Sequence, residues 1–506
     1  MHNKAPLSFT QPASTEPEAP LVRTLPADLE TPVSIYLKLA NGSSPSFLLE
    51  SVTGGEQVAR YSFIGVQPRR MYRLQANRLI ICEADGGQRV RLGDPFQQME
   101  EEFRARRRPV IPGLPRFSGG LVGYLGYEAV RWFEPGVAHL PVDQEMADGL
   151  FLEADGLVAF DHAFGRVILI VHPDPLLPSS ERQQQAHQRL DEMEELLRRP
   201  LPITLSFSRG GGLAQTGWTS PPREAFLQAV ERARQAIEAG EIFQVVLSQR
   251  FTRLTAAHPF EIYRTLRRLN PSPYMFYLDF ADWNGDPPLR LIGASPEIHV
   301  RLTGRNAIIR PIAGTRPRGA TPEQDAELEK DLLADPKERA EHIMLVDLAR
   351  NDLGRVCTFG SVQVSEQMNI ERYSHVMHIV SQVEGQLRPE MNAFGLMRAT
   401  LPAGTVSGAP KVRAMQIIAD LEDQPRGVYA GAVGYFAYDG NLDTCIAIRT
   451  LVMRGNRVDL QAGAGIVADS VPEREYEEIL KKARALAQAV ELTEKMEVNN
   501  HAAHSG

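Results

Sequence analysis

The spacing of apolar and polar residues differs between the first and second parts of the chain. From about residue 46 to 175, short apolar runs alternate with turn signals, which predicts strands. The runs Leu157–Phe160 and Val167–Val171, joined through Asp161–Gly165, predict a β-hairpin. The polar stretch Pro175–Pro200 then predicts a helix with proline at both ends.

The second part of the chain combines longer helices with strands. Helical spacing predicts helices at Pro222–Ala239, Pro322–Ala349 (broken near Asp335-Pro336), Pro410–Leu421 and Pro472–Val490. Apolar runs predict strands at Ile242–Leu247, Tyr274–Asp279, Leu291–Ala294, Ala307–Ile312, Ala432–Tyr438, Thr444–Met453 and Val458–Gly463. Because strands and helices do not alternate one for one, we expect an α+β fold with antiparallel sheets.

The domain organisation follows from the length and from one glycine-rich break. A chain of 506 residues is long enough for two or three domain-sized units. Arg209–Gly212 interrupts the pattern and places a boundary near residues 200–220. We therefore expect four parts: an irregular N-terminal tail over 1–30, an N-terminal subdomain over 31–210, a C-terminal subdomain over 220–495 and a disordered tail over 496–506.

Composition narrows the possible environment and partners. The net charge of −8 argues against nonspecific binding of nucleic acid, which requires a basic face. The three cysteines, Cys82, Cys357 and Cys445, are far apart and lack CxxC spacing, which is typical of a reducing compartment. The chain has neither a membrane-spanning apolar stretch nor the apolar core of a signal peptide near its start. We expect a cytoplasmic protein that binds neither nucleic acid nor membrane.

Two pairs of glutamates stand three residues apart in predicted helices. Glu338 and Glu341 share one helix face, and Glu475 and Glu478 repeat the spacing in the last helix. Mg²⁺ prefers oxygen ligands and is often held by a few carboxylates together with substrate oxygens. Two helices that each present two glutamates are suited to such a site, although a solvated acidic face explains the same spacing.

Two segments rich in small residues indicate places where a backbone can approach an anion. Gln461–Gly465 is interpreted as a glycine loop between a strand and a helix, and Ser470 with Glu473 matches a capping box; a tight turn is the alternative. Leu401–Lys411 places Thr405 and other polar groups near a helix N-terminus, a position that favours an anion.

Three single residues are weaker candidates. His378 is more often a packed core histidine than a catalytic base, and Glu297 at a strand end is by default a surface residue. Arg449 interrupts an apolar strand, and an arginine that faces inward usually needs an anionic partner.

Six short motifs occur along the chain: Pro311–Arg316, Glu341–Asp352, Gly404–Lys411, Gly431–Tyr435, Asp443–Arg449 and Gly463–Gly465. Together they resemble the chorismate-utilising enzymes, specifically anthranilate synthase component I of tryptophan biosynthesis, over about residues 45–490. The resemblance implies a two-layered antiparallel β-sheet sandwich flanked by helices. It also implies a lyase that converts chorismate and ammonia into anthranilate and pyruvate, the first committed step of L-tryptophan biosynthesis.

The resemblance assigns roles to particular residues. It implies that Glu341 and Glu478 bind Mg²⁺, with Glu338 and Glu475 nearby. Glu297 is implied as the general acid for the departing ring hydroxyl and His378 as the base for the later proton abstraction; Thr405 joins them as a catalytic candidate. Chorismate is expected to contact Gly314, Thr315, Tyr429, Arg449, Gly463, Ala464, Gly465 and Lys482.

Two positions separate this family from its relatives. Family members that add water carry a lysine base where Gln244 stands, and many aminodeoxychorismate synthases carry a nucleophilic lysine where Ala313 stands. Glutamine and alanine support neither reaction, so both positions favour anthranilate as the product. Aminodeoxychorismate synthase and isochorismate synthase remain the neighbouring alternatives.

The same resemblance implies regulation and a partner. Glu50, Ser51, Pro273, Tyr274 and Met275 are expected to bind L-tryptophan as a feedback inhibitor. No cysteine stands in a nucleophile-elbow context, so a separate glutamine amidotransferase subunit, component II, is expected to supply ammonia. The assembly is expected to be a homodimer or a heterotetramer. A catalytically idle sensor of amino acids is the alternative from another class, and the intact set of candidate catalytic residues argues against it.

Overall fold

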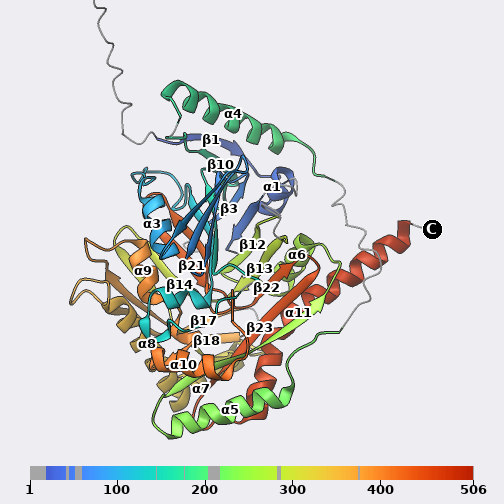
Figure 1. Cartoon of the computed structure of the whole chain (residues 1–506). Helices are drawn as coiled ribbons and strands as arrows, with labels where there is room; N and C mark the ends of the chain where they lie inside the picture. The colour runs from blue at the N-terminus through green and yellow to red at the C-terminus, as the bar shows by residue number, and fades with distance from the viewer. Residues whose placement is uncertain are drawn as a thin grey trace, which may run out of the picture.

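Two large antiparallel sheets form the centre of the molecule, with helices outside them (Figure 1). The computed structural model describes residues 19–40, 45–51, 60–143, 145–175, 177–202, 217–281, 287–373 and 376–504. Side chains of the two sheets meet in a shared apolar layer, where the rings of Phe63 and Tyr435 lie 6.2 Å apart. The predicted α+β sandwich is confirmed.

The first sheet has eleven strands and contains both halves of the chain. Its strands, in spatial order, are β1 (Leu21–Pro26), β10 (Arg166–Val171), β9 (Gly156–Asp161), β3 (Tyr61–Val66), β2 (Ser46–Glu50), β12 (Tyr274–Asp279), β13 (Leu289–Ser295), β22 (Thr450–Arg454), β23 (Arg457–Ile466), β11 (Gln244–Leu254) and β19 (Gly408–Ala409). Strands β2 and β12 join the N-terminal and C-terminal parts by antiparallel pairing, for example of Glu50 with Met275.

The second sheet has twelve strands. Along its main path they are β16 (Ile312–Pro317), β18 (Val376–Gln386), β15 (Asn306–Ile309), β14 (Ile298–Thr303), β21 (Leu442–Ile446), β20 (Ala432–Ala437), β7 (Gly120–Leu125), β8 (Gly149–Ala154), β4 (Arg70–Gln75), β5 (Arg78–Glu83) and β6 (Gln88–Leu92), while β17 (Gln363–Arg372) pairs with β18. Here β20 and β7 join the two halves. The subdomains expected on either side of residues 200–220 therefore share both sheets.

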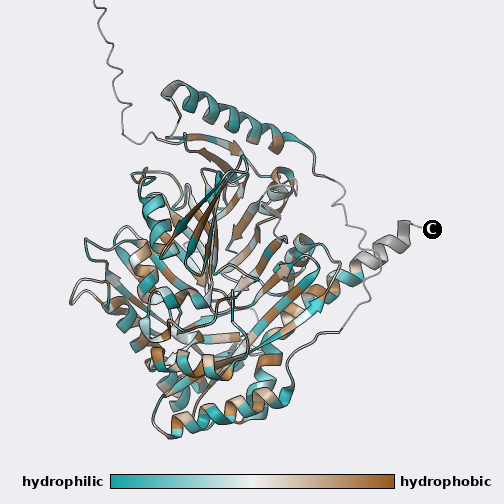
Figure 2. Ribbon diagram, viewed as in Figure 1, coloured by the Kyte–Doolittle hydropathy of each residue, from teal (hydrophilic) through white to brown (hydrophobic). Residues whose placement is uncertain are grey.

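Helices surround the sheets. They are α1 (Pro32–Leu39), α3 (Pro95–Arg104), α4 (Ser179–Arg198), α5 (Arg223–Glu238), α6 (Pro259–Leu269), α7 (Pro322–Ala334), α8 (Pro336–Gly354), α9 (Ala393–Thr400), α10 (Lys411–Leu421) and α11 (Pro472–His504), with short 3₁₀ helices η1 (Tyr127–Trp132), η2 (Pro135–Val137) and η4 (Gly404–Val406). The strands carry most of the hydrophobic residues, whereas α4, over β1 and β10, is largely hydrophilic (Figure 2).

The break between α7 and α8 shows how the local sequence sets a boundary. Asp335 ends α7, and its carboxylate accepts hydrogen bonds from the backbone N–H groups of Lys337 and Glu338 at the start of α8. Pro336 occupies the first position of α8, where its missing N–H costs nothing. The predicted break near Asp335-Pro336 is confirmed, and it positions Glu338 in the first turn of the new helix.

Several sequence predictions need correction. Strand β1 lies within residues 1–30, which were expected to be irregular, because pairing with β10 satisfies its backbone; residues 1–18 lie outside the described part. Helix α11 runs to His504 through most of the expected disordered tail. Gln461–Gly465 belongs to β23 and is not a loop. Because α11 begins at Pro472, Ser470 does not cap it, and its hydroxyl accepts a hydrogen bond from Val467 N at 3.0 Å.

Two predicted strands are each divided in the structure. Ala307–Ile312 is split between β15 and β16. Thr444–Met453 is split between β21 and β22, which belong to different sheets, and Arg449 lies in the connection with a φ of 52°. The glycine break at Arg209–Gly212 lies outside the described residues.

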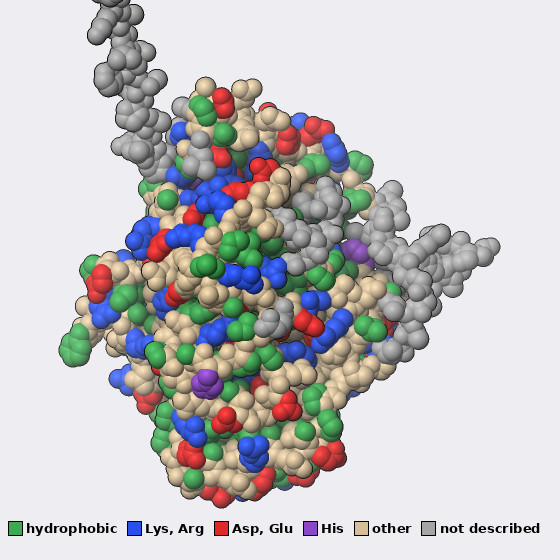
Figure 3. Space-filling model, in the orientation of Figure 1, with side chains coloured by type: hydrophobic (Ala, Val, Ile, Leu, Met, Phe, Trp, Pro, Cys, Tyr) green, Lys and Arg blue, Asp and Glu red, His purple; other side chains and the backbone are tan. Residues whose placement is uncertain are grey.

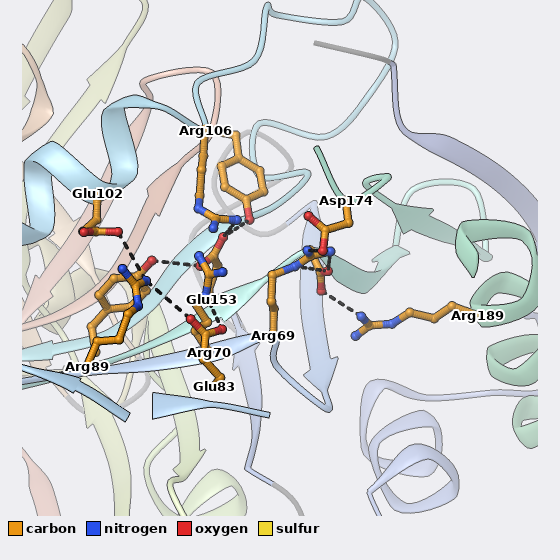
Figure 4. A network of polar contacts seen from close by, with 12 residues as sticks. Arg69, Arg70, Glu83, Arg89, Glu102, Arg106, Glu153, Asp174 and Arg189 are labelled. Carbon is orange, nitrogen blue, oxygen red and sulfur yellow. Dashed lines mark hydrogen bonds and ion pairs between the residues drawn. The ribbon is translucent and has the colours of Figure 1, made fainter. Parts of the chain in front are cut away.

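A buried polar network links the two halves of the chain at β8 (Figure 4). The fully buried carboxylate of Glu153 accepts hydrogen bonds from the hydroxyls of Tyr72 at 2.9 Å and Tyr438 at 3.0 Å, and it pairs with Arg106 Nη1 at 2.8 Å. Burial raises the pKa of Glu153 to about 7. Since every one of these groups has a partner, the network is part of the scaffold.

The surface carries charges of both signs. Basic and acidic side chains are intermingled over the face seen in Figure 3. Across the described residues, the structure has no helix that is both long and apolar enough to span a membrane.

Candidate active site

One large cavity gathers nearly all of the candidate site residues. It has a volume of about 1010 Å³ and is bounded by β16, β18, β23, α8, α11 and the connection between β21 and β22. The predicted residues that line it are Glu297, Gly314, Thr315, Glu338, Glu341, His378, Thr405, Tyr429, Arg449, Gly463, Gly465, Glu475, Glu478 and Lys482. These residues are spread over 186 positions of the sequence, from 297 to 482.

The two glutamate pairs face each other across this cavity. Burial and the negative charges of Glu338 and Glu478 raise the pKa of Glu341 on α8. Burial and the charge of Glu478 likewise raise the pKa of Glu475. Mutual repulsion of this kind is what a divalent cation relieves, so the donor set fits Mg²⁺. Among the described residues, no group of three or more His, Cys, Asp and Glu side chains is close enough to form a ready-made metal site.

The acidic groups are held by neighbouring polar side chains. Glu341 Oε1 accepts a hydrogen bond from Gln244 Nε2 at 3.0 Å, and Glu478 Oε1 pairs with Lys482 Nζ at 2.7 Å. Lys482 Nζ also donates to the carbonyl of Gly463 at 3.0 Å. Lys482 therefore links the acidic face of α11 to the strand that forms the cavity wall.

His378 is oriented by the strand next to it. Its Nδ1 lies 2.9 Å from the carbonyl oxygen of Gly314 and 3.1 Å from Thr315 Oγ1. Because a carbonyl only accepts, Nδ1 carries the proton and Nε2 keeps its lone pair. Burial lowers the pKa of His378, so the ring is a neutral base near pH 7. Gly314 has a φ of 70° at a bulge in β16, a conformation that favours glycine.

Glu297 lies in the short connection between β13 and β14, at the wall of the cavity. It is only 8% exposed, and burial raises its pKa to about 8. The hydroxyl of Thr405 lies beside this carboxyl without the geometry of a hydrogen bond. A carboxyl group that stays protonated near neutral pH is suited to donate a proton.

Arg449 and Tyr429 form another part of the wall. Arg449 Nη1 donates to the carbonyl of Lys482 at 2.6 Å, and the guanidinium faces Glu478 and Tyr429 without an ion pair to any described residue. Burial lowers the pKa of Arg449. A buried guanidinium with unused donors is suited to an anionic ligand.

Strand β23 contributes glycines on the cavity side. A Cβ atom at Gly463 would lie 2.6 Å from the hydroxyl of Tyr429, and one at Gly465 would lie 2.8 Å from Gln244 Nε2. Glycine therefore allows these side chains to approach the strand. Ala464 is the exception among the substrate candidates, because the alternation of a strand turns its methyl group into the apolar core, where it is fully buried.

Several lining residues were not singled out from the sequence. Lys337, Arg474 and Lys481 add positive charge to the cavity, and Lys337 pairs with Asp469 at 2.9 Å. Their only sequence signal is their position beside or near the glutamate pairs, which a solvated helix face explains equally well. The discriminating positions Gln244 and Ala313 also line the cavity.

A separate pocket contains all of the residues predicted for the inhibitor. Glu50, Ser51, Pro273, Tyr274 and Met275 line it, together with aromatic side chains. The Glu50 carboxylate is bound by Arg267 at 3.0 and 3.1 Å and by the hydroxyl of Tyr263. The pocket thus has apolar walls and polar groups held in fixed orientations, as small-molecule sites do.

Comparison with known proteins agrees with this geometry. The family model described as chorismate binding enzyme matches residues 44–488. Anthranilate synthase component 1 of Pseudomonas aeruginosa is 47% identical over 500 residues, covering 97% of this chain and 96% of that protein. The Thermus thermophilus protein of the same name is 47% identical over 477 residues, covering 94% and 98%.

Solved structures give the same result for the fold. Anthranilate synthase component I from Streptococcus pneumoniae TIGR4 superposes with a TM-score of 0.72 at 37% identity, covering 85% of this chain and 92% of that one. The menaquinone-specific isochorismate synthase from Escherichia coli has a TM-score of 0.69 at 20% identity, covering 94% and 96%, and shows the shared fold. The chain belongs to the chorismate-binding enzymes and, within them, to the anthranilate synthase component I family.

Proposed function

We propose that this chain is the aminating subunit of a Mg²⁺-dependent anthranilate synthase, which converts chorismate and ammonia into anthranilate, pyruvate and water. The observation that carries the proposal is that one cavity combines a protonated carboxyl group, a neutral imidazole base and a guanidinium without an ion pair to any described residue. The first two supply acid and base, and the third supplies a counter-charge for an anionic substrate.

The cavity supports binding of a substrate with two carboxylates. Arg449 is positioned to pair with the enolpyruvyl carboxylate, and its donors are not used by any carboxylate of the described chain. Glu341 and Glu478 would hold Mg²⁺, with Glu338 and Glu475 nearby, and the bound cation would neutralise the ring carboxylate of chorismate.

Glu297 and His378 are proposed to act in successive proton transfers. Glu297 donates a proton to the ring hydroxyl, which leaves as water while ammonia forms a bond to the ring. His378 Nε2 then removes the ring proton, the bond to the enolpyruvyl oxygen breaks, and the ring becomes aromatic. Return of that proton to the enolpyruvate gives pyruvate, so the histidine is restored.

Two cavity residues favour anthranilate over the products of related enzymes. Gln244 has an uncharged amide whose nitrogen donates to Glu341, so it cannot act as a base toward water. Ala313 has no amine with which to form a covalent intermediate. Both features support ammonia as the nucleophile.

The experiment that tests this function is product analysis. Purified chain, chorismate, Mg²⁺ and an ammonium salt are incubated at mildly alkaline pH, and anthranilate is measured by fluorescence and mass spectrometry. Anthranilate and pyruvate in equal amounts are the expected products, and a reaction without Mg²⁺ is the control. An amino- or hydroxychorismate product would assign the chain to a related activity.

A separate glutamine amidotransferase subunit is proposed as the source of ammonia. The chain has three cysteines, all at most 3% exposed, and burial raises the pKa values of Cys357 and Cys445. Buried, protonated thiols are poor nucleophiles. The chain alone should therefore release no glutamate from glutamine, while ammonium salts sustain turnover; glutamate release would contradict the proposal.

We also propose that L-tryptophan binds the pocket around Glu50 and Tyr274 and inhibits the enzyme. Strand β12 supports a path to the active site, because Tyr274 pairs with Ser295, two residues before Glu297. The hydroxyl of Tyr274 also donates to Asp443 at 2.8 Å, on the strand that leads to Arg449. Occupancy of the pocket can thus bias the position of both residues. Unchanged activity across a tryptophan titration would contradict this.

A further inference from the structure

A second, smaller cavity adjoins the large cavity at Glu297. We call it the rear chamber. It has a volume of about 30 Å³ and shares Glu297, Leu345 and Thr405 with the large cavity. Its other walls come mainly from β14, α8 and the segment from Thr400 to Gly404. Glu297 therefore belongs to the walls of both the substrate cavity and the rear chamber.

The rear chamber contains a buried histidine with an unused nitrogen. His299 is 2% exposed, and its Nδ1 lies 3.1 Å from Thr444 Oγ1. The Thr444 hydroxyl also contacts the carbonyl of Val300 at 3.2 Å, where the carbonyl can only accept. The Nε2 atom of His299 is buried and has no hydrogen-bond partner among the described residues.

Thr405 presents a second unused polar atom to the same space. Its Oγ1 is buried, lines the rear chamber and has no hydrogen-bond partner in the described part of the chain. Buried polar atoms left without a partner destabilise a fold, so such atoms usually bind a water molecule. A water molecule needs about 10–15 Å³ and two to four polar partners, so the rear chamber has room for about two.

An ion pair forms another part of the chamber wall. Lys411 Nζ donates to both oxygens of Asp352 at 2.8 and 2.7 Å, and Asp352 lines the rear chamber. The side chains of Lys411 and Asp352 are 14% and 11% exposed, so the pair is mostly buried but keeps some contact with solvent. The polar groups of the chamber thus extend from Glu297 to the vicinity of the surface.

The proposed reaction requires a proton to come back to Glu297. Ammonia brings three hydrogens, the amine keeps two, and the third leaves as a proton. This balances the proton that Glu297 gives to the departing hydroxyl. Bound intermediate and products would block access of solvent to Glu297 from the substrate cavity. A proton that reaches Glu297 from the rear chamber would restore the acid for the next turnover.

We propose that the rear chamber holds one or two ordered water molecules, bound by His299 Nε2 and Thr405 Oγ1, that return a proton to Glu297 after each turnover. An O–H bond of the water breaks as the carboxyl O–H bond forms, and the water regains a proton from solvent past Asp352 and Lys411. His299 is a positioning residue, since it holds the water and does not touch the substrate. This inference rests on the proposed role of Glu297 as the acid.

Two variants test the relay by different routes. His299→Phe removes the ring nitrogen Nε2 that would hold the water, and Ala349→Val fills the rear chamber from α8, where Ala349 is apolar and lines it. The matched control is Ala399→Val, which adds the same volume at a buried position of α9 that does not line the chamber.

We expect both variants to lower the rate of repeated turnover but not the rate of a single turnover. With enzyme in excess over chorismate at pH 7, Glu297 starts protonated, so the single-turnover rate should be unchanged in both variants. Steady-state kcat should fall at least about tenfold, with a larger solvent deuterium isotope effect. Ala399→Val should change neither. Equal loss of both rates, or no loss, would overturn the relay, whereas Glu297→Gln should abolish both phases and so tests the acid itself.

A second measurement does not depend on how well the variants fold. A high-resolution crystal structure of the unmodified chain should show density for water within hydrogen-bond distance of His299 Nε2 and Thr405 Oγ1. An empty rear chamber would overturn the proposal.

Discussion

Replacement of Glu297 by glutamine should stabilise the protein at alkaline pH while it removes activity. The pKa of Glu297 is about 8 in the folded chain and has an ordinary value of 4.5. Below pH 4.5 the group is protonated in both folded and unfolded chains and has no effect on the free energy of unfolding. As pH rises from 4.5 to 8, only the unfolded chain ionises, so stability falls; above pH 8 the loss is complete.

The size of the effect follows from these two values. The difference of about 3.5 pH units, at about 1.36 kcal/mol per unit, corresponds to about 5 kcal/mol at high pH. Between pH 5 and pH 9 the unmodified chain should lose about 4 kcal/mol more unfolding free energy than Glu297→Gln. Over the same range, kcat of the variant should be about 10²–10⁴-fold lower, the usual contribution of a general acid.

The assay is urea unfolding of both proteins at pH 5, 7 and 9, with kcat measured in parallel. Glu327→Gln is the control, because Glu327 is exposed on α7 and its replacement removes a carboxylate without touching the cavity. Stability curves of the unmodified chain and Glu297→Gln that run parallel from pH 5 to 9 would refute the argument that burial keeps this carboxyl protonated. Retention of kcat would refute its role as the acid.

Three further predictions concern the cation, the substrate anion and the inhibitor. A chelator should abolish turnover and added Mg²⁺ should restore it, while Glu341→Gln should raise the Mg²⁺ concentration needed for half-maximal rate; an unchanged Mg²⁺ titration would remove Glu341 from the site. Arg449→Lys should raise KM for chorismate by about tenfold or more with a smaller effect on kcat, because lysine lacks the paired donors, and steady-state kinetics would decide. Glu50→Gln should weaken L-tryptophan binding in calorimetry. It should also lower stability by about 1–3 kcal/mol, since it removes the carboxylate that binds the partly exposed Arg267. Undiminished inhibition by tryptophan would contradict the assignment.

Local sequence was sufficient to predict an element where the hydrophobic periodicity and the residues at the ends of the element indicated the same structure. Strand β12 has the predicted bounds Tyr274–Asp279, the hairpin of β9 and β10 was predicted, and Asp335-Pro336 gave the break before α8. Each of these features depends on residues within a few positions of one another. The motifs likewise indicated the family, because they are runs of adjacent residues.

Local sequence was insufficient where distant segments decide the conformation. Gly463–Gly465 was interpreted as a loop because glycine is a turn residue, yet pairing with β11 makes it a strand, and its missing side chains leave room for Tyr429 and Gln244. The run Thr444–Met453 looked continuous, but the chain passes from one sheet to the other at Arg449. Strand β1 is stabilised by β10, about 145 residues away.

By itself, the sequence determined the alternation of strands and helices, the glutamate pairs and the types of residue that chorismate chemistry requires. The tertiary structure alone decided that these groups meet: Gln244 reaches Glu341 across 97 positions, and Arg449 contacts the backbone of Lys482 on another element. Tertiary packing also buries particular groups. This burial raises the pKa of Glu297 and lowers the pKa of His378, so Glu297 is protonated and His378 is neutral near pH 7. The physical reason is that periodicity and capping act over a few residues, whereas burial and charge depend on every segment packed nearby.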